Sequence, residues 1–321
     1  MTNKCTFASN SVKVAAVAAA ATVATNIMAE NVRTTPPSRE VDSALAVFFS
    51  DLHVNGREDI GYVHQADHLR RTVSEILALD PLPANAICCG DIAFLWGMPE
   101  DYALVREILQ PLVEAGIKVT LGIGDHDRRD RFLEFWPESA ASSPVPGRVV
   151  SVVELPFLDV IVLDTVNDDP IGFRERTRPG DIGEAQRKWL AERLASAKKP
   201  VIVCGHHGAK EDAIELADLL VDSPACKGCV NGHWHRWRND FIYADHDRRL
   251  LKSVCIPSTG HWGDIGWCLM RVFPDKAVME LRQRDYFNTA LGEGKPEGAP
   301  QTDRDLVLED RKGQKATFWL K

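Results

Sequence analysis

The chain has 321 residues, a length at which about 75% of the unfolded chain's surface can be buried, in one large domain or two small ones. Its 38 basic and 46 acidic side chains give a net charge of −8, which excludes a general electrostatic attraction to nucleic acid or anionic membrane. An apolar fraction of 45% with 26% charged residues is typical of a folded globular protein and argues against extensive disorder.

The first twenty-nine residues have the pattern of a secretory signal peptide. Lys4 and Lys13 are their only charged side chains, and residues 14–25 form an apolar, Ala-rich run. A membrane-spanning helix needs about 20 apolar residues, so this run predicts no transmembrane anchor. We expect a leader at residues 1–29, a linker at residues 30–43 and an exported protein. A cytoplasmic protein with an Ala-rich N-terminal helix is the alternative.

Cysteine usage predicts core positions rather than disulfides. Loss of the leader would remove Cys5 and leave seven cysteines, an odd number that cannot all pair. Cys88, Cys89 and Cys204 lie in apolar runs, where a thiol behaves as a small hydrophobe. The Cys226-Lys-Gly-Cys229 motif could be structural, a local disulfide or half of a zinc knuckle. We favour structural thiols, because no second CxxC motif completes a four-thiolate site.

After the linker, short apolar runs alternate with longer stretches of helical character. Buried strands are predicted at residues 44–49, 86–89, 117–123, 149–155, 160–163, 201–204 and 228–231. Helices are predicted at residues 68–79, 102–115, 181–197 and 212–221. The third helix starts with a pair that resembles a capping box, Asp181 and Glu184. This alternation is typical of an α/β fold.

Beyond the last of these elements the pattern changes to strand-like runs without helices. The runs at residues 241–244, 250–256, 267–273 and 277–282 predict a second, largely antiparallel sheet. Residues 291–314 are rich in Gly, Pro and charge, which predicts a surface tail, and residues 316–320 could dock as an edge strand. The expected organisation is therefore one domain at residues 44–290 and a C-terminal tail at residues 291–321.

Polar side chains follow five of the predicted strands. They form the motifs Asp51-x-His53, Gly90-Asp91, Gly124-Asp125-His126-Asp127, Gly205-His206 and Gly232-His233-x-His235. Any one of these motifs alone is more often a turn or a satisfied core histidine than a ligand. Open α/β sheets, however, gather their ligands at the carboxyl ends of the strands. Five such clusters together predict a site for two metal ions.

The order of these motifs resembles the calcineurin-like metallophosphoesterase superfamily, over about residues 44–236. That resemblance implies an α/β fold in which two packed mixed β-sheets are flanked by helices, a four-layer αββα sandwich. Further motifs resemble the branch that contains cyclic-nucleotide and glycerophosphodiester phosphodiesterases. These motifs are Asp127-Arg128 with Phe132-Leu-Glu-Phe, Val162-Leu-Asp-Thr165, Gly183-x5-Trp189-Leu and Gly205-His-His. Most members of that branch have Pro after the His pair, where this chain has Gly208.

The resemblance implies a role for each motif residue. One metal ion would be bound by Asp51, His53 and His235, the other by Asp125, His206 and His233, and Asp91 would bridge the two. Imidazole and carboxylate ligands suit zinc, iron and manganese, so the expected cofactor is a pair of divalent or mixed-valence ions of these metals.

The same resemblance implies hydrolysis of a small phosphoester, with a diester favoured over a monoester. A hydroxide held between the two ions would attack phosphorus. His126 would assist as general acid or phosphate stabiliser, and Asp127 would orient an imidazole.

Substrate contacts are expected from residues beside the motif loops. Of the histidine pair, the family pattern favours His206 as the metal ligand, while His207 would line the substrate pocket. Arg128, Arg236 and His261 are further candidates, although exposed arginines often serve solubility.

Asp125 departs from the family pattern, which usually has Asn there. Asp keeps a metal-binding oxygen but cannot donate an amide N–H to a bound phosphate. This departure leaves open an alternative function, a metal-binding module that recognises a phosphorylated ligand without turnover. A nuclease is disfavoured, because phosphate-backbone binding recruits several Lys or Arg residues and this chain is acidic. No nucleic-acid partner is expected.

Overall fold

The computed structural model describes residues 39–57, 64–167, 180–209, 213, 215–243, 249–260, 263–287, 311 and 313–321. The expected leader, most of the expected linker and the tail between residues 288 and 310 lie outside these described residues. Among the helices that are described, none combines the length and the apolar character needed to cross a bilayer.

The first sheet is built around the apolar strand predicted at residues 44–49. This strand, β1 (Val41–Phe49), sends alternate side chains to opposite faces. Ala46 and Phe48 enter one hydrophobic cluster, and Val47 and Phe49 enter another. Because residues 45–49 of β1 are buried on both faces, this part of the strand is apolar without interruption.

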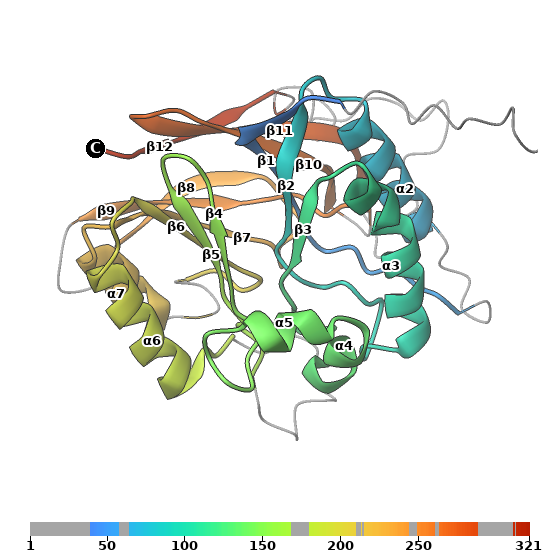
Figure 1. Cartoon of the computed structure of the whole chain (residues 1–321), viewed down its shortest axis with the longest axis horizontal. Coiled ribbons are helices and arrows are strands. Elements are labelled where there is room, and N and C mark those ends of the chain that lie inside the picture. The colour runs from blue at the N-terminus through green and yellow to red at the C-terminus, as the bar shows by residue number, and fades with distance from the viewer. Residues whose placement is uncertain are drawn as a thin grey trace, which may run out of the picture. The chain divides into compact units, whose positions relative to one another are not determined.

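Six strands form this sheet in the order β12-β11-β10-β1-β2-β3 (Figure 1). The strands β1, β2 and β3 are parallel, and β10, β11 and β12 extend the sheet in antiparallel fashion. The bounds are β2 Leu82–Cys88, β3 Lys118–Leu121, β10 Gly263–Val272, β11 Lys276–Phe287 and β12 Lys315–Trp319.

The second sheet has the order β4-β5-β6-β7-β9-β8. Its four central strands are parallel, and an antiparallel strand lies at each edge. The bounds are β4 Ser151–Glu154, β5 Asp159–Val162, β6 Val201–Gly205, β7 Cys226–Asn231, β8 Arg238–Tyr243 and β9 Leu250–Cys255. Both sheets are therefore mixed.

Helices cover the outer face of each sheet (Figure 1). On the first sheet, α2 (His64–Leu77) and α3 (Pro99–Glu114) share a hydrophobic cluster with β1 and β2. On the second, α6 (Gly183–Ala195) and α7 (Glu215–Asp222) share another cluster with β5, β6 and β7. Two short helices, α4 (Arg129–Phe135) and α5 (Pro137–Ser142), follow the loop after β3.

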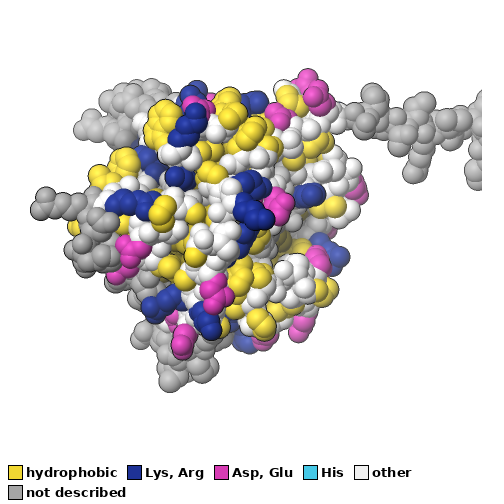
Figure 2. Space-filling view, turned by 60° about the vertical axis from the view of Figure 1, so that its left-hand side comes forward, with side chains coloured by type: hydrophobic (Ala, Val, Ile, Leu, Met, Phe, Trp, Pro, Cys, Tyr) yellow, Lys and Arg dark blue, Asp and Glu magenta, His cyan; other side chains and the backbone are white. Residues whose placement is uncertain are grey.

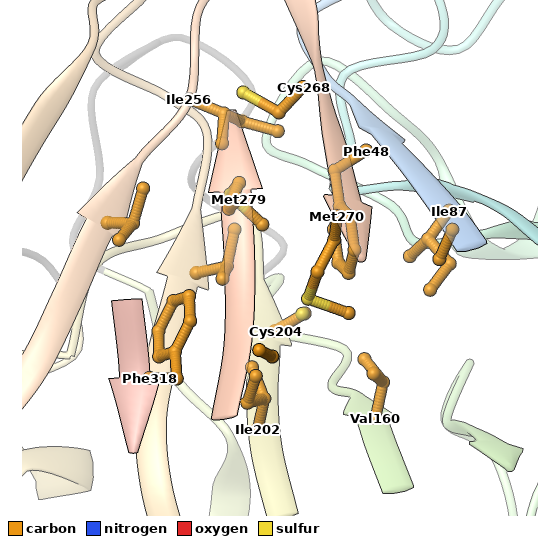
Figure 3. Packing of buried hydrophobic residues seen from close by; sticks show 14 of the residues in the cluster. Phe48, Ile87, Val160, Ile202, Cys204, Ile256, Cys268, Met270, Met279 and Phe318 are labelled. Atoms are coloured by element: carbon orange, nitrogen blue, oxygen red, sulfur yellow. The ribbon is translucent and has the colours of Figure 1, made fainter. Parts of the chain in front are cut away.

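A third cluster fills the space between the two sheets. Figure 3 shows Phe48, Met270 and Phe318 of the first sheet facing Ile202 and Cys204 of the second. All five side chains are at most 1% exposed. The layers are thus helix, sheet, sheet and helix, and the predicted αββα sandwich is confirmed.

The prediction that residues 241–282 form a sheet of their own is wrong. The strands β8 and β9 complete the second sheet, where β9 pairs in parallel with β7. The strands β10 and β11 join the first sheet instead, and β10 runs antiparallel to β1. Strand periodicity reports which residues face a core, but it does not report which edge a strand joins. The strand expected at residues 316–320 is β12, at the outer edge of the first sheet.

Several predicted boundaries also change. β1 begins at Val41, inside the expected linker, and the two short helices α4 and α5 were not predicted. The capping box at Asp181 and Glu184 does not form. Helix α6 begins at Gly183, after Ile182, and the Asp181 carboxylate instead accepts a hydrogen bond from the Gly183 backbone N–H at 2.7 Å.

The seven cysteines of the described residues are all buried and unpaired by disulfides. The prediction of core thiols at Cys88, Cys89 and Cys204 is confirmed. Cys226 and Cys229 lie in β7 as free thiols, so the alternative of a local disulfide is excluded.

Candidate metal centre

Five loops at the carboxyl ends of strands meet at one edge of the two sheets. The loops after β1, β2 and β3 come from the first sheet, and those after β6 and β7 come from the second. Together they bring the seven predicted metal ligands into overlapping groups, in each of which the donor atoms lie within 4.8 Å of one another. These residues are Asp51, His53, Asp91, Asp125, His206, His233 and His235.

A first group of donors consists of Asp51, His53 and His235. His235 Nε2 lies 3.2 Å from Asp51 Oδ1 and 3.2 Å from His53 Nε2. All three side chains are buried. The sequence assigned these three residues to one metal ion, and the structure places them together.

A second group of donors contains Asp125, His206 and His233, the residues assigned to the other ion, and also His207. Asp125 Oδ1 lies 3.0 Å from His206 Nε2 and 3.3 Å from His233 Nδ1. Those two imidazole nitrogens are 3.2 Å apart. Asp125 and His233 are partly exposed, whereas His206 and His207 are buried.

Asp91 lies between the two groups, in the position predicted for a bridging ligand. Its Oδ2 is 3.5 Å from His53 Nε2 of the first group and 3.2 Å from His206 Nε2 of the second. One carboxylate oxygen therefore lies within reach of both groups.

The spacing of the donors fits metal ions. Ligand atoms about 2.1 Å from a tetrahedral ion lie roughly 3.4 Å apart, which is close to the separations within both groups. Asp125 Oδ2 is buried and has no hydrogen-bond partner among the described residues. Such an uncompensated polar atom is costly without a further partner, and a cation would provide one.

Backbone strain marks the same residues. Among the described residues, six other than glycine have a positive φ, and five of these are predicted ligands. They are Asp51, His53, Asp91, His233 and His235, with φ between 45° and 69°. Each such conformation costs on the order of 1–3 kcal/mol and persists where the surrounding structure imposes it, most often at functional sites.

The charges of the cluster depend strongly on one another. Burial by itself raises the pKa of the Asp51 carboxyl, but the neighbouring His235 and His206 outweigh burial and lower the pKa to about 2. Burial opposes protonation of His206, yet Asp91 and Asp125 hold its pKa well above the usual value. Burial likewise opposes ionisation of Asp125, but its hydrogen bond to His206 keeps the pKa well below the usual range. The carboxylates thus remain ionised and favour a cation between them.

His126 is oriented by the loop after β2. Its Nδ1 lies 2.6 Å from the carbonyl oxygen of Phe94, which can only accept, so Nδ1 carries a proton and Nε2 is the nitrogen available to a ligand. The ring lies edge-on to His53, with 4.5 Å between centroids, and is partly exposed. Burial opposes protonation of His126, but the charges of Asp91 and Asp125 raise its pKa.

Asp127 does not orient an imidazole, so that prediction is wrong. Its carboxylate accepts hydrogen bonds from the backbone N–H groups of Ile92, Ala93 and Gly124, at 2.9 to 3.0 Å. The Tyr102 hydroxyl donates to it at 3.1 Å. Asp127 lies inside the turn, where these N–H groups converge, and it holds the loops after β2 and β3 together.

Asp101, at the start of α3, has a similar positioning role that the sequence did not reveal. It accepts hydrogen bonds from the backbone N–H of Gly56 at 2.9 Å and of Phe94 at 3.2 Å. These residues belong to the loops after β1 and β2. An acidic residue in the first turn of a helix was the available signal, but the predicted helix began one residue later.

The loop after β9 holds the backbone at the end of β1 and was also missed. Ser258 Oγ donates to the carbonyl of Asp51, and Thr259 Oγ1 donates to the carbonyl of Ser50, both at 2.9 Å. This loop follows a predicted strand, as the five motif loops do, but Ser258 and Thr259 carry neither a carboxylate nor an imidazole, the side chains that identify metal ligands.

The four predicted substrate contacts have different environments. His207 is buried and belongs to the second group. The Arg128 guanidinium forms an ion pair with Asp130 at 2.6 Å, and Arg236 is exposed. His261 lies outside the described residues.

Known proteins share the fold of this chain. The chain is similar to a dimetal phosphatase from Danio rerio, with 13% identity and a TM-score of 0.57 over 78% of this chain and 99% of that one. It is also similar to PhoD, with 11% identity and a TM-score of 0.53 over 83% of this chain and 70% of that one. At these identities the likeness shows the fold alone. No curated protein sequence matches the chain.

The family model for calcineurin-like phosphoesterases matches residues 45–237. That range covers more than half of the chain and contains both donor groups and Asp91. The chain therefore belongs to the calcineurin-like phosphoesterase family.

Proposed function

We propose that this protein is a binuclear metal-dependent phosphodiesterase. The observation that carries the proposal is the position of Asp91, whose Oδ2 lies within 3.5 Å of a nitrogen from each donor group. Two donor groups that share one carboxylate are the arrangement needed to hold two cations a few ångströms apart.

The donor set suits zinc, iron or manganese. Bound cations would polarise the phosphoryl group and activate a water molecule as the nucleophile. The protein's own contribution is to hold its donors in strained, fixed positions. It does so through Asp101 and Asp127, which tie three of the ligand-bearing loops to one another and to α3.

We assign His126 as the general acid. Phe94 holds the ring by its Nδ1, and Asp91 and Asp125 favour its protonated form. When the bond between phosphorus and the leaving oxygen breaks, His126 Nε2–H would donate its proton to that oxygen. A positioned acid of this kind contributes typically 10²- to 10⁴-fold to the rate.

The charge of the site favours a diester over a monoester. A diester carries one negative charge, whereas a monoester carries about −1.5 to −2 at pH 7. The two donor groups and Asp91 already contain three carboxylates. The motifs that resemble the phosphodiesterase branch, among them Val162-Leu-Asp-Thr165, support the same preference.

A small substrate is favoured over nucleic acid. The net charge is −8, and on the face in Figure 2 basic and acidic side chains are interspersed rather than separated into a continuous basic surface. We also propose that the protein is exported, on the basis of the composition of residues 1–29. Sequencing the N-terminus of the mature protein tests this, and an intact Met1 would contradict it.

The activity is tested with metal-free protein reloaded with Zn²⁺, Mn²⁺ or Fe²⁺. We expect bis-p-nitrophenyl phosphate to be hydrolysed faster than p-nitrophenyl phosphate, and only when two ions are bound per chain. A protein that binds two ions but hydrolyses neither ester would support the alternative of a phosphate-recognition module.

The role of His126 is tested by His126→Asn with two diesters that differ in leaving group. Hydrolysis that expels an alkoxide should fall by about 10² or more, because an alkoxide needs a proton. Hydrolysis that expels p-nitrophenolate should fall much less. Equal losses for both would contradict the assignment of His126 as the acid.

A further inference from the structure

The second donor group contains a histidine that the sequence assigned to the substrate pocket. His207 follows His206 at the end of β6, and its Nε2 lies 3.7 Å from Asp125 Oδ1. Its ring centroid is 4.8 Å from that of His233. We propose that His207 is a metal ligand through Nε2, so that three imidazoles and Asp125 bind the second ion. This inference rests on the proposed binuclear function.

The burial of His207 Nε2 favours a bound cation at this atom. The side chain is 1% exposed, so water cannot readily solvate the ring. Nε2 itself is buried and has no hydrogen-bond partner among the described residues. Leaving a buried polar atom without a partner destabilises the folded protein. A cation bound at Nε2 removes this cost.

The contacts of the other ring nitrogen, Nδ1, suit metal binding at Nε2. His207 Nδ1 lies 2.8 Å from Thr165 Oγ1, and the same oxygen accepts the backbone N–H of His207 at 3.2 Å. A metal at Nε2 requires the proton on Nδ1, and the hydroxyl oxygen can accept it. Metal-bound histidines almost always have such an acceptor behind them.

The backbone fixes the ring in this orientation. A Cβ placed on Gly180 would lie 2.6 Å from both Cβ and Cγ of His207. The main chain at Gly180 therefore packs directly against the imidazole, and a larger residue there would displace it.

The separations of the four donors suit one ion. Asp125 Oδ1 lies 3.0, 3.3 and 3.7 Å from the nitrogens of His206, His233 and His207. Donors of a tetrahedral site with bonds of about 2.1 Å lie roughly 3.4 Å apart. With Asp91 Oδ2, which lies 3.2 Å from His206 Nε2, the second ion would have five donors, and His207 is one of them.

A third imidazole makes the two metal positions unequal. The first group offers two imidazoles, and the second offers three. Imidazole favours zinc and its transition-metal neighbours over manganese and magnesium, which prefer oxygen. The second group should therefore bind Co²⁺ more tightly than the first group does. It should also have the stronger preference for Co²⁺ over Mn²⁺.

The test is a Co²⁺ titration of the metal-free full-length protein, followed by equilibrium dialysis and by the visible spectrum of bound Co²⁺. We expect the wild type to bind two ions. His207→Asn should weaken the tighter ion at least tenfold and change its spectrum. His235→Asn is the matched control in the first group and should weaken the other ion instead.

A second pair of variants covers the case in which His207→Asn fails to fold. Thr165→Val removes the acceptor behind Nδ1 and keeps the shape of the side chain. It should weaken the tighter ion by about 10- to 100-fold. Thr165→Ser keeps the hydroxyl and should restore wild-type binding. Equal binding by the Val and Ser variants would overturn the proposal.

The outcomes separate this inference from the proposed function. If His207→Asn binds two Co²⁺ ions with wild-type affinities and spectrum, His207 is not a ligand, whether or not esters are hydrolysed. If binding depends on His207 but the loaded wild type hydrolyses no ester, the proposed function fails and the ligand assignment stands. A wild type that binds no ion overturns both, and one that binds a single ion overturns the binuclear function.

Discussion

Asp125 adds a third carboxylate to a cluster that already contains Asp51 and Asp91. Its Oδ1 lies within 3.3 Å of His206 and His233, and its Oδ2 is buried without a partner among the described residues. Asn would offer a metal the same oxygen but would replace the negative charge with an N–H donor. We therefore expect the charge at this residue to strengthen metal binding and to weaken the binding of highly charged phosphate.

We predict that Asp125→Asn weakens retention of the second ion by roughly tenfold, which corresponds to about 1.4 kcal/mol. The variant should also raise kcat/KM for a monoester relative to a diester, because the dianion is repelled less. Metal content after dialysis against a chelator and the ratio of the two kcat/KM values measure these effects.

Asp67→Asn is the control for this prediction. It removes an exposed carboxylate that pairs with Arg70 on α2, outside the donor groups, and it should change neither metal content nor ester preference. If Asp125→Asn leaves metal content and turnover both unchanged, the role assigned to Asp125 is wrong.

Individual ligands were predictable because each follows a strand directly. The residues that position these side chains were harder to predict from the sequence. Asp127 belongs to the same motif as Asp125, yet its carboxylate points to the backbone of the neighbouring loop. Sequence spacing places a residue on a loop, but the path of the loop decides what the side chain contacts.

At the scale of elements, helix α3 anchors the loops that follow β1 and β2. Asp101 connects its first turn to Gly56 and Phe94. Burial raises the pKa of Asp101 to about 6, although these hydrogen bonds and Arg57 lower it. The folded protein therefore binds a proton at Asp101 more tightly than the unfolded chain, where the pKa is near 3.9.

This shift predicts a pH dependence of stability. Because the pKa is raised on folding, the stability linked to Asp101 is present in full below about pH 4 and is lost as pH rises through about 6. The free energy of unfolding of the wild type should fall relative to Asp101→Asn by up to about 3 kcal/mol between pH 4 and pH 7.

Urea unfolding of both proteins without metal across that range measures the difference. The Asn side chain does not titrate, so the two stability curves should converge or cross as pH rises. Parallel curves would show that Asp101 has an ordinary pKa in the folded protein.

The long elements were predictable, and the short ones were not. The apolar run of β1 and the helical stretch of α3 contain enough residues to display their periodicity. Helices α4 and α5 have 7 and 6 residues, too few to display a helical period. Helix α4 is held by tertiary contacts, because Phe132 and the adjoining Trp136, which stack on one another, both lie edge-on to Tyr102 of α3.

At the scale of the whole molecule, β12 forms the outer edge of the first sheet and contacts β7 of the second sheet. Phe318 is fully buried between the sheets (Figure 3), and a Cβ on Gly228 of β7 would lie 2.4 Å from its ring. Trp319, the next residue, points the other way and is 63% exposed.

We predict that Phe318→Ala lowers the free energy of unfolding by about 3–5 kcal/mol, the usual cost of deleting a buried aromatic side chain. Trp319→Ala, in the same strand, should change it by no more than about 0.5 kcal/mol. Urea unfolding monitored by circular dichroism measures both. Similar losses for the two variants would mean that β12 does not contribute its inner face to the core.

The sequence by itself determined the central strands, from the period of apolar residues, and the polar motifs that follow five of them. The resemblance of those motifs to the metallophosphoesterase superfamily then implied the αββα class and the seven donor residues. Only the tertiary structure decided that β10 and β11 join the first sheet, that Asp127 bonds to backbone, and that His207 faces Asp125 together with His206. Each of these depends on contacts between segments far apart in the chain, which form only when the two sheets pack and their loops meet at one edge.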